Sequence, residues 1–260
     1  MSNAQTIQDS LLALFAADGN RKRLVVSGGV GYVVFSHTHQ DTLEIQAAGG
    51  RQLPKGTQIA PEFYQQLAHW GLRQKKAAAN FRATSPIDDP QTSSSLWSKR
   101  AETILQVAYT ASSITVTSRC ETLQDPDNSS LITAMRSLAE KRSWSARTGV
   151  YTKLIQAQLI LLVKQSTPLN GPLEVSDILS LKELGGRPVA TVFTNTTTLD
   201  KHDPTLLDVR LVTGAELFPL LSAGKFGSLM INPGNDVRGE LYSNEIWTVT
   251  EGIRRLGGRH

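Results

Sequence analysis

The stretch Val189–Gly234 decides the fold of the second half of this 260-residue chain; it reads VATVFTNTTTLDKHDPTLLDVRLVTGAELFPLLSAGKFGSLMINPG. It opens with an apolar run into Phe193-Thr194, which predicts a short buried strand. Leu207–Val212 alternates and predicts another strand, followed by a helix at Gly214–Leu221. The stretch closes with Ile231-Asn232-Pro233-Gly234. Here Asn before Pro is expected to be extended and Gly permits positive φ, so the sequence predicts a fixed turn at a strand end.

The residues VFTN, ELFPLL and INPG in this stretch resemble the SseB N-terminal domain family, which typically has a "vFTs" strand, an "elf.ll" helix and an "iNPg" turn. The likeness extends over about residues 130–256. It implies a small α/β module and brings no particular reaction with it.

The first half alternates between helical and strand periodicities. Helices are predicted at Thr6–Ala17, Ala60–Trp70 and Leu96–Tyr109, with Leu96, Ile104, Leu105 and Ala108 of the last one facing inward. Strands are predicted at Arg23–Ser27, Tyr32–Ser36, Thr42–Ala47, Asn80–Ala83 and Ile114–Cys120. The clean alternation of Thr42–Ala47 suits an antiparallel sheet with one packed face and one wet face.

This order resembles the YbjN-like and type III secretion chaperone-like peptide-binding domains over about residues 5–110. The matching residues are Tyr32–Phe35, Leu43–Ile45, Leu67, Trp70-Gly71-Leu72, Asn80-Phe81 and the helix at Ala101–Tyr109. The likeness implies a domain that holds a peptide or helix of a partner protein in an apolar groove.

The second half adds helices at Leu131–Lys141 and Ala146–Ile155 and a last helix capped by Asn244. Ala157–Lys164 is apolar on both faces and is predicted to be a central strand. The polar, proline-containing segment 123–130 is the predicted linker between a domain at residues 1–122 and a domain at residues 131–260. The predicted fold class is α/β (α+β), with two small domains, each a mostly antiparallel or mixed sheet with helices packed on it.

Charge and composition disfavour several classes of function. There are 12 basic and 10 acidic residues up to Asp125 and 15 and 13 after it, so the net charge of +4 is evenly spread. A nucleic-acid-binding protein usually concentrates its basic residues, so no such partner is expected. No apolar run is long enough to cross a bilayer, and the amphipathic N-terminus does not resemble a signal peptide. With Cys120 as the single cysteine, a cytoplasmic location is expected.

Three motifs invite a chemical interpretation, and each has a plainer one. Gly28–Gly31 lies between two strands, so a hairpin turn is favoured over a phosphate loop, which must run into a helix. His37, His39 and Asp41 have ligand-type side chains, but a solvated strand end is favoured over a metal site. Cys120 falls on the apolar side of a strand and is expected to be packed and inert rather than a nucleophile. No catalytic residue, cofactor or metal is expected.

Two places remain as candidate binding surfaces. Tyr32, Phe81 and Trp97 are the candidate partner surface of the first domain, with Trp97 expected to be partly exposed because Lys99 and Arg100 follow it. Asn232, Pro233 and Gly234 form either a binding rim or a purely structural turn.

The resemblances favour a non-enzymatic, cytoplasmic, chaperone-like adaptor that binds a protein or peptide. A homodimer is the other assembly that the sequence leaves open. The alternative is a sensor of a small ligand, or an enzyme, whose site the sequence does not reveal. An apolar, rimmed groove would favour the adaptor, whereas clustered ionisable groups in a pocket would favour the alternative.

Overall fold

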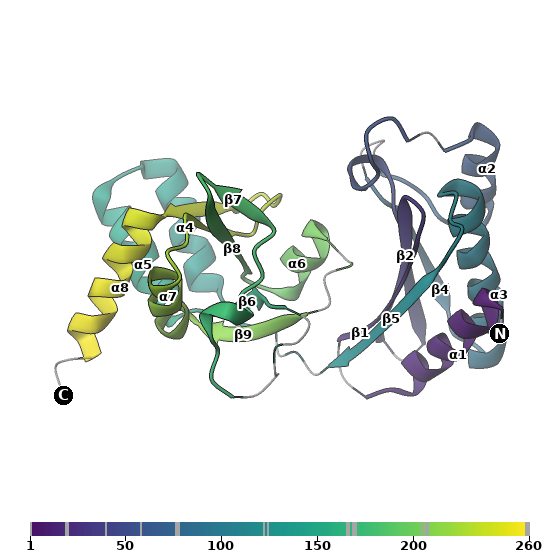
Figure 1. Ribbon diagram of the computed structural model, residues 1–260, viewed down its shortest axis with the longest axis horizontal. Helices are drawn as coiled ribbons and strands as arrows, with labels where there is room; N and C mark the ends of the chain where they lie inside the picture. The colour runs from purple at the N-terminus through teal and green to yellow at the C-terminus, as the bar shows by residue number, and fades with distance from the viewer. Residues whose placement is uncertain are drawn as a thin grey trace. The chain divides into compact units, whose positions relative to one another are not determined.

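The computed structural model describes residues 2–18, 21–39, 41–57, 59–75, 79–121, 123, 125–164, 167, 171–203, 205 and 208–257. The chain divides into two compact units, Met1–Gln124 and Asp125–His260. Each unit is α+β, with helices packed on a sheet (Figure 1).

The sheet of the first unit is antiparallel throughout, with strand order β4-β3-β2-β1-β5. Its strands are β1 (Arg21–Gly28), β2 (Gly31–His39), β3 (Thr42–Ala47), β4 (Phe81–Pro86) and β5 (Thr115–Glu121). The hairpin predicted at Gly28–Gly31 is confirmed, because Gly28 and Gly31 face each other across β1 and β2. Strands β1, β2 and β3 are thus the centre of the sheet, with β4 and β5 at its two edges.

One face of this sheet is covered by helices α1 (Asn3–Ala16), α2 (Pro61–His69) and α3 (Pro90–Thr103), the last continuing into a π-helical segment, Ile104–Ala108 (Figure 1). Ser2 and Asp89 cap α1 and α3 by accepting the backbone N–H groups of Gln5 and Thr92. The core lies between this helical layer and the alternate side chains Leu24, Val26, Val33, Phe35 and Ile45.

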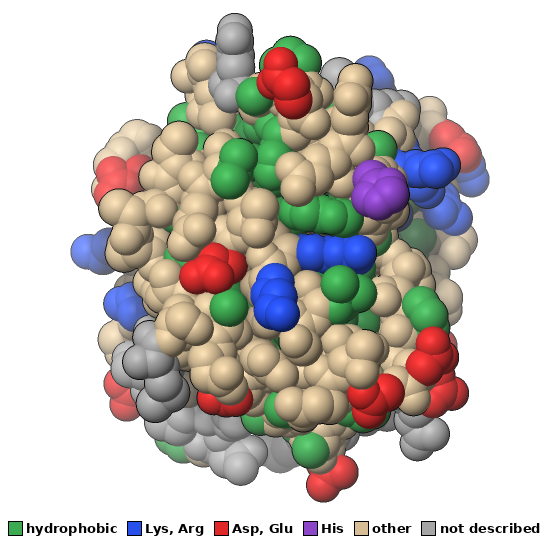
Figure 2. Space-filling view, turned by 90° about the vertical axis from the view of Figure 1, so that its right-hand side faces the viewer, with side chains coloured by type: hydrophobic (Ala, Val, Ile, Leu, Met, Phe, Trp, Pro, Cys, Tyr) green, Lys and Arg blue, Asp and Glu red, His purple; other side chains and the backbone are tan. Residues whose placement is uncertain are grey.

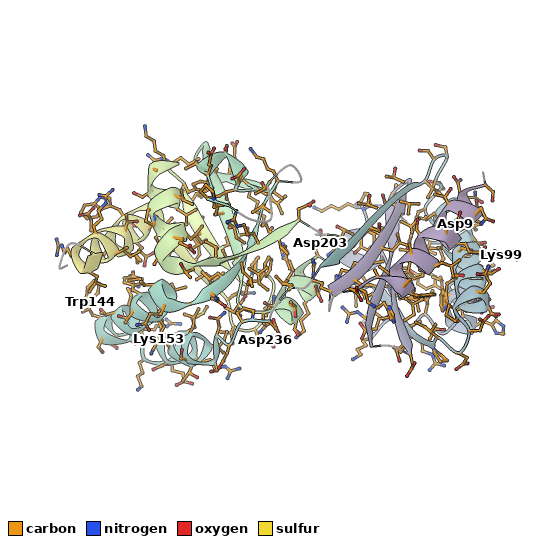
Figure 3. The ribbon with its side chains drawn as sticks, turned by 90° about the horizontal axis from the view of Figure 1, so that it is seen from below. Asp9, Lys99, Trp144, Lys153, Asp203 and Asp236 are labelled. Atoms are coloured by element: carbon orange, nitrogen blue, oxygen red, sulfur yellow. The ribbon has the colours of Figure 1, made fainter. Side chains whose placement is uncertain are left out.

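The outer side of the first unit is chemically mixed. In Figure 2, hydrophobic side chains are interspersed with Lys, Arg, Asp and Glu. In Figure 3, Asp9 of α1 and Lys99 of α3 both lie on this helical side. Leu96, expected to face inward, is 44% exposed here, because α3 begins at Pro90 and turns Trp97 and Ala101 toward the core instead.

The sheet of the second unit is mixed, with strand order β11-β10-β8-β6-β9 and β7 paired to β8. Its strands are β6 (Gln158–Leu162), β7 (Lys182–Leu184), β8 (Arg187–Phe193), β9 (Val209–Thr213), β10 (Ser228–Ile231) and β11 (Gly239–Tyr242). Only the pair formed by β8 and β10 is parallel among the pairs of the described residues. The predicted central position of the Ala157–Lys164 strand is confirmed, since β6 lies between β8 and β9 and residues 159–162 are fully buried.

The helices of this unit are α4 (Ser129–Lys141), α5 (Trp144–Gln156), α6 (Thr196–His202), α7 (Gly214–Ala223) and α8 (Ser243–Gly257). Helices α4, α5, α7 and α8 share one core with Leu159, Leu161, Val192, Leu229 and Leu241 of the sheet. Alternation therefore turns the side chains of Ile160, Leu162 and Phe193 to the opposite face, where α6 packs against β8.

One local expectation is wrong in this unit. Asn232 is not extended but has a left-handed φ of 49°. A proline favours an extended conformation at the residue before it. Asparagine nevertheless adopts a left-handed φ more readily than most residues, because its short polar side chain can form local hydrogen bonds. The hydrogen-bond partners of the Asn232 amide are described below.

Candidate functional site

The aromatic surface expected on the first unit is absent at two of its three positions. Phe81 and Trp97 are each 2% exposed and belong to the core. Phe81 shares the helical face of the sheet with Ala47, and Trp97 makes an edge-to-face contact with Phe35, with ring centroids 6.4 Å apart. The guanidinium of Arg100 covers the Trp97 ring at 4.8 Å. Tyr32 is half-buried, and its hydroxyl accepts a hydrogen bond from the Asn80 side chain at 3.0 Å.

The glycine-rich turn serves packing. Gly29 has a φ of 59°, and the N–H of Val30 donates to the carbonyl of Tyr109 at 3.1 Å. A Cβ on Gly31 would lie 2.5 Å from the Tyr109 ring. Tyr109 is itself fully buried and donates its hydroxyl to the Ala48 carbonyl at 2.5 Å. Burial raises the pKa of this phenol well above its usual range. The glycines therefore let the hairpin approach a buried tyrosine closely.

Among the side chains that the structure describes, the ligand-type residues of the first unit are not brought together as a site. His37 is buried, and its ring packs edge-on against Phe15 at 5.5 Å, while Asp41 is exposed. The side chains of His39 and Cys120 lie outside the described part of the chain. Among the described residues, no group of three His, Cys, Asp or Glu side chains is arranged to hold a metal ion.

The turn after β10 is a buried polar network. The Asn232 Oδ1 accepts the backbone N–H of Thr194 at 2.9 Å, and its Nδ2 donates to Thr194 Oγ1 and to the Val237 carbonyl. Asn232 is 0% exposed and Pro233 is also buried, which leaves Gly234 as the exposed member of the turn. These bonds join the ends of β8 and β10, so the structural interpretation of the turn is the better supported one.

A cavity of about 430 Å³ lies elsewhere in the second unit. It opens between α4, α5, the start of α8 and strand β11. Its lining residues are Met135, Leu138, Ala139, Arg147, Val150, Tyr151, Ile231, Arg238, Gly239, Glu240, Leu241, Tyr242, Asn244 and Glu245. We call this the β11 groove. Its buried lining residues are apolar and its exposed ones are largely charged or polar, a combination typical of a binding site.

The local structure fixes the walls of the β11 groove. Asn128 anchors the start of α4 by donating from Nδ2 to the carbonyls of Gln158 and Thr194 at 2.6 and 2.9 Å. Ser143 caps α5 by accepting the N–H of Ala146 at 3.2 Å. The Asn128 contacts hold the start of α4 against the sheet, and the Ser143 cap stabilises the first turn of α5.

The groove follows the edge of the sheet. Four consecutive residues of β11, from Gly239 to Tyr242, line it. Successive side chains of a strand point to opposite faces, so a cavity lined by four in a row lies along the strand edge and not over one face. β11 is the terminal strand of the sheet in the described part of the chain.

Glu245 organises the polar end of the groove. Its Oε1 accepts the Tyr151 hydroxyl at 2.5 Å and lies 3.5 Å from the Arg147 guanidinium, while its Oε2 accepts the backbone N–H of Tyr242 at 3.1 Å. Burial and then the Glu245 hydrogen bond raise the pKa of Tyr151 to about 12. The phenol is therefore protonated at neutral pH, and both carboxylate oxygens are already engaged.

Two exposed tryptophans lie about one helical turn from residues that line this groove, without lining it themselves. Trp144 is 72% exposed at the start of α5, and helical spacing puts it on one stripe with Arg147 and Tyr151. Trp247 is 57% exposed and follows Asn244 by three residues on α8. Figure 3 shows Trp144 and Lys153 projecting from the outside of the second unit. No pattern in the sequence predicted this site, although a Glu at the third position of a helix is a recognisable capping signal.

Comparisons with known proteins place the groove within one recognised module. Residues 131–248 match the SseB protein N-terminal domain. This range contains every residue that lines the β11 groove. The comparisons found no match to a curated protein and none to a solved structure. No helix in the described part of the chain combines the length and apolar character needed to cross a membrane.

Proposed function

We propose that this protein is a non-enzymatic, cytoplasmic adaptor that holds a segment of a partner protein in the β11 groove. The observation that carries the proposal is an apolar-floored cavity along a sheet edge, with exposed Trp144 and Trp247 about one helical turn from its lining residues. Tryptophan, tyrosine and arginine supply most of the binding energy in protein interfaces, and Tyr151 and Arg147 complete that set here.

The polar groups of the groove support binding more than catalysis. Both oxygens of Glu245 hold structural hydrogen bonds, to the Tyr151 hydroxyl and to the Tyr242 N–H, which fix the orientation of the carboxylate. A tyrosine whose pKa is raised to about 12 is poorly suited to accept a proton at neutral pH. Glu245 and Tyr151 thus give the rim a fixed shape, which lowers the entropic cost of binding.

The first unit enters this proposal as a second contact surface. Its likeness to the YbjN-like and secretion chaperone-like domains stays a prediction. The buried positions of Phe81 and Trp97 move the leading candidate for the partner site from this unit to the second.

Site-specific photo-cross-linking in cells tests the adaptor proposal. Ala139 is exposed and lines the groove, so a photoreactive amino acid at this position should give discrete protein adducts. The next residue of α4, Glu140, is exposed and does not line the groove, which makes it the matched control. The adducts are identified by mass spectrometry.

A blocking substitution then connects the adduct to the groove. The purified partner should bind the native protein, and Ala139→Trp should weaken that binding about tenfold or more by filling the cavity. Glu140→Trp should bind as the native protein does. Equal adducts at both positions, or equal affinity of both tryptophan variants, would contradict the proposal.

A small ligand is the second candidate occupant. Cavities for small molecules measure roughly 300–1,000 Å³, and the groove falls in that range with Arg147, Tyr151 and Glu245 converging on it. A metabolite library screened by thermal shift would support this candidate if a compound stabilised the native protein and Glu140→Trp but not Ala139→Trp.

A further inference from the structure

Within the part of the chain that the structure describes, the backbone of β11 has hydrogen-bonding groups without a partner beside the groove. Ser228 faces Tyr242 in the ladder with β10, and the N–H of Ser243 donates to the carbonyl of Gly227 at 3.1 Å. In an antiparallel pair, residues that exchange backbone bonds alternate with residues that do not. Gly239 and Leu241 therefore bond to β10, whereas Glu240 and Tyr242 point their N–H and C=O groups away from it.

The hydrogen bond of the Tyr242 N–H shows directly that this group points away from β10. The Tyr242 N–H does not reach β10 but donates to the Glu245 carboxylate at 3.1 Å. Glu245 thus covers one end of the edge and leaves the N–H and C=O of Glu240 at its centre. Within the described residues, no strand pairs with this side of β11.

The space beside Glu240 suits a side chain from an added strand. Gly239 and Leu241 face the helical layer, and a Cβ on Gly239 would lie 3.3 Å from the terminal methyl of Met135. A residue opposite Gly239 on an added strand would point to the same layer, toward Met135, Leu138 and Val150 of the groove.

The charges along the β11 edge indicate which residues should flank the apolar residue of an added strand. Arg238 and Glu240 are both exposed, both line the groove, and neither has an ion-pair partner among the described residues. Residues directly opposite each other on adjacent strands stabilise the pair when their charges are opposite. An added strand therefore matches this edge with a cation opposite Glu240 and an anion opposite Arg238.

We propose that the occupant is an extended segment of a partner protein that adds to β11 as an antiparallel strand. From its N-terminus, the segment reads Lys or Arg, then a large apolar residue, then Asp or Glu. Its backbone bonds to Glu240, and its apolar side chain enters the β11 groove. This inference rests on the proposed adaptor function and adds the binding mode and the chemistry of the partner.

A second copy of this chain fits less well. Its own Arg238-Gly239-Glu240 has the required order of charges, so an antiparallel pair of β11 edges would match Arg238 with Glu240 twice. Glycine would then stand opposite Gly239, and the cavity of about 430 Å³ would receive no side chain. A partner with a large apolar residue at that position buries the apolar floor as well.

Capped heptapeptides titrated into the full-length protein test the inference. The matching peptide is Thr-Thr-Lys-Leu-Glu-Thr-Thr, the charge-exchanged peptide is Thr-Thr-Glu-Leu-Lys-Thr-Thr, and a third has Gly in place of Leu. The readout is the NMR shift of the Glu240 amide, which detects binding into the millimolar range. The matching peptide should bind saturably, and the other two should bind about tenfold more weakly.

Exchanging the charges of the protein provides the decisive control. In the double variant Arg238→Glu, Glu240→Arg the preference should reverse, so that the charge-exchanged peptide binds more tightly. The folded state of each variant is checked by its amide spectrum. Binding without reversal, a preference of the native protein for the charge-exchanged peptide, or no binding of any peptide overturns the inference.

Two further outcomes distinguish strand addition by a partner from the adaptor function in general and from a dimer of this chain. Cross-linking at Ala139 together with peptides that do not bind would leave the adaptor function standing and remove the strand-addition mode. A native dimer that dissociates in Arg238→Glu and reforms in the double variant, measured by light scattering, would assign the edge to a second copy and overturn the partner segment.

Discussion

At the scale of single residues, the positions that resemble functional motifs mainly serve close packing and buried hydrogen bonding. Gly28–Gly31 suggests a phosphate loop, but Gly29 and Gly31 are required because Tyr109 lies directly against the turn. Asn232 suggests a binding rim, but its amide bonds to Thr194 and Val237 in a fully buried position. The residues that line the groove, such as Ala139 and Arg238, belong to no recognisable motif.

Gly31→Ala should destabilise the protein by about 1–3 kcal/mol, because the new Cβ would lie 2.5 Å from the Tyr109 ring in a packed core. Gly149→Ala is the matched control. Gly149 lies inside α5 with no heavy atom near its missing Cβ, so this change should stabilise the protein by about 0.5–1 kcal/mol. Urea denaturation measures both. Equal effects of the two substitutions would show that Tyr109 does not restrict the turn.

At the scale of elements, the start of α8 connects the helix to the edge strand. Glu245 accepts the N–H of Tyr242 at the end of β11 and the hydroxyl of Tyr151 on α5. The consecutive elements β11 and α8 and the distant helix α5 are thereby held around one carboxylate. This arrangement gives the β11 groove its polar end and fixes the orientation of Arg147.

This contact predicts a change in stability at high pH. The pKa of Tyr151 is about 12 in the folded protein, above the ordinary value of about 10. The stabilisation is therefore fully present below pH of about 10 and is lost as the pH rises through about 12. The stability difference between the native protein and Tyr151→Phe should shrink over that interval.

A matched pair of variants assigns this pKa to its cause. Glu245→Gln should lower the pKa of Tyr151, seen as tyrosinate absorbance at lower pH, because the carboxylate no longer accepts the phenol proton. Glu240→Gln lines the same groove without bonding to Tyr151 and should leave the titration unchanged. An identical titration of both variants would exclude Glu245 as the partner that matters.

At the scale of the whole molecule, each unit has its own hydrophobic core. The core of the first is built by residues between Ile7 and Val116, and that of the second by residues between Leu131 and Ile253. Neither cluster uses a residue of the other unit. The family match covers only the second unit, so it gives no information about the function of the first unit.

Fragments 1–124 and 125–260 should therefore each fold alone. Each should give a folded circular dichroism spectrum and unfold in one cooperative transition. Fragment 125–260 should also retain the binding properties of the β11 groove. A fragment that is soluble only when the other is present would contradict this and indicate a shared core.

The sequence by itself determined the elements with strong periodicity. The hairpin of β1 and β2, the buried strand β6, and helices α4, α5 and α7 follow from local patterns, because burial on one face or both leaves a period in the chain. The α+β class and the SseB-like pattern were available from the same residues. Short elements such as α6, β7 and β11 were missed, because seven or fewer residues carry little periodic signal.

The tertiary structure alone decided where a partner is expected to bind. Trp97 and Phe81 resemble surface or core residues equally well in sequence, and only packing against Phe35 and Ala47 buries them. The β11 groove gathers residues from Met135 to Glu245 that no local pattern relates. Its free edge exists because β11 ends the order of strands, a property of the whole sheet that the four residues of β11 do not encode.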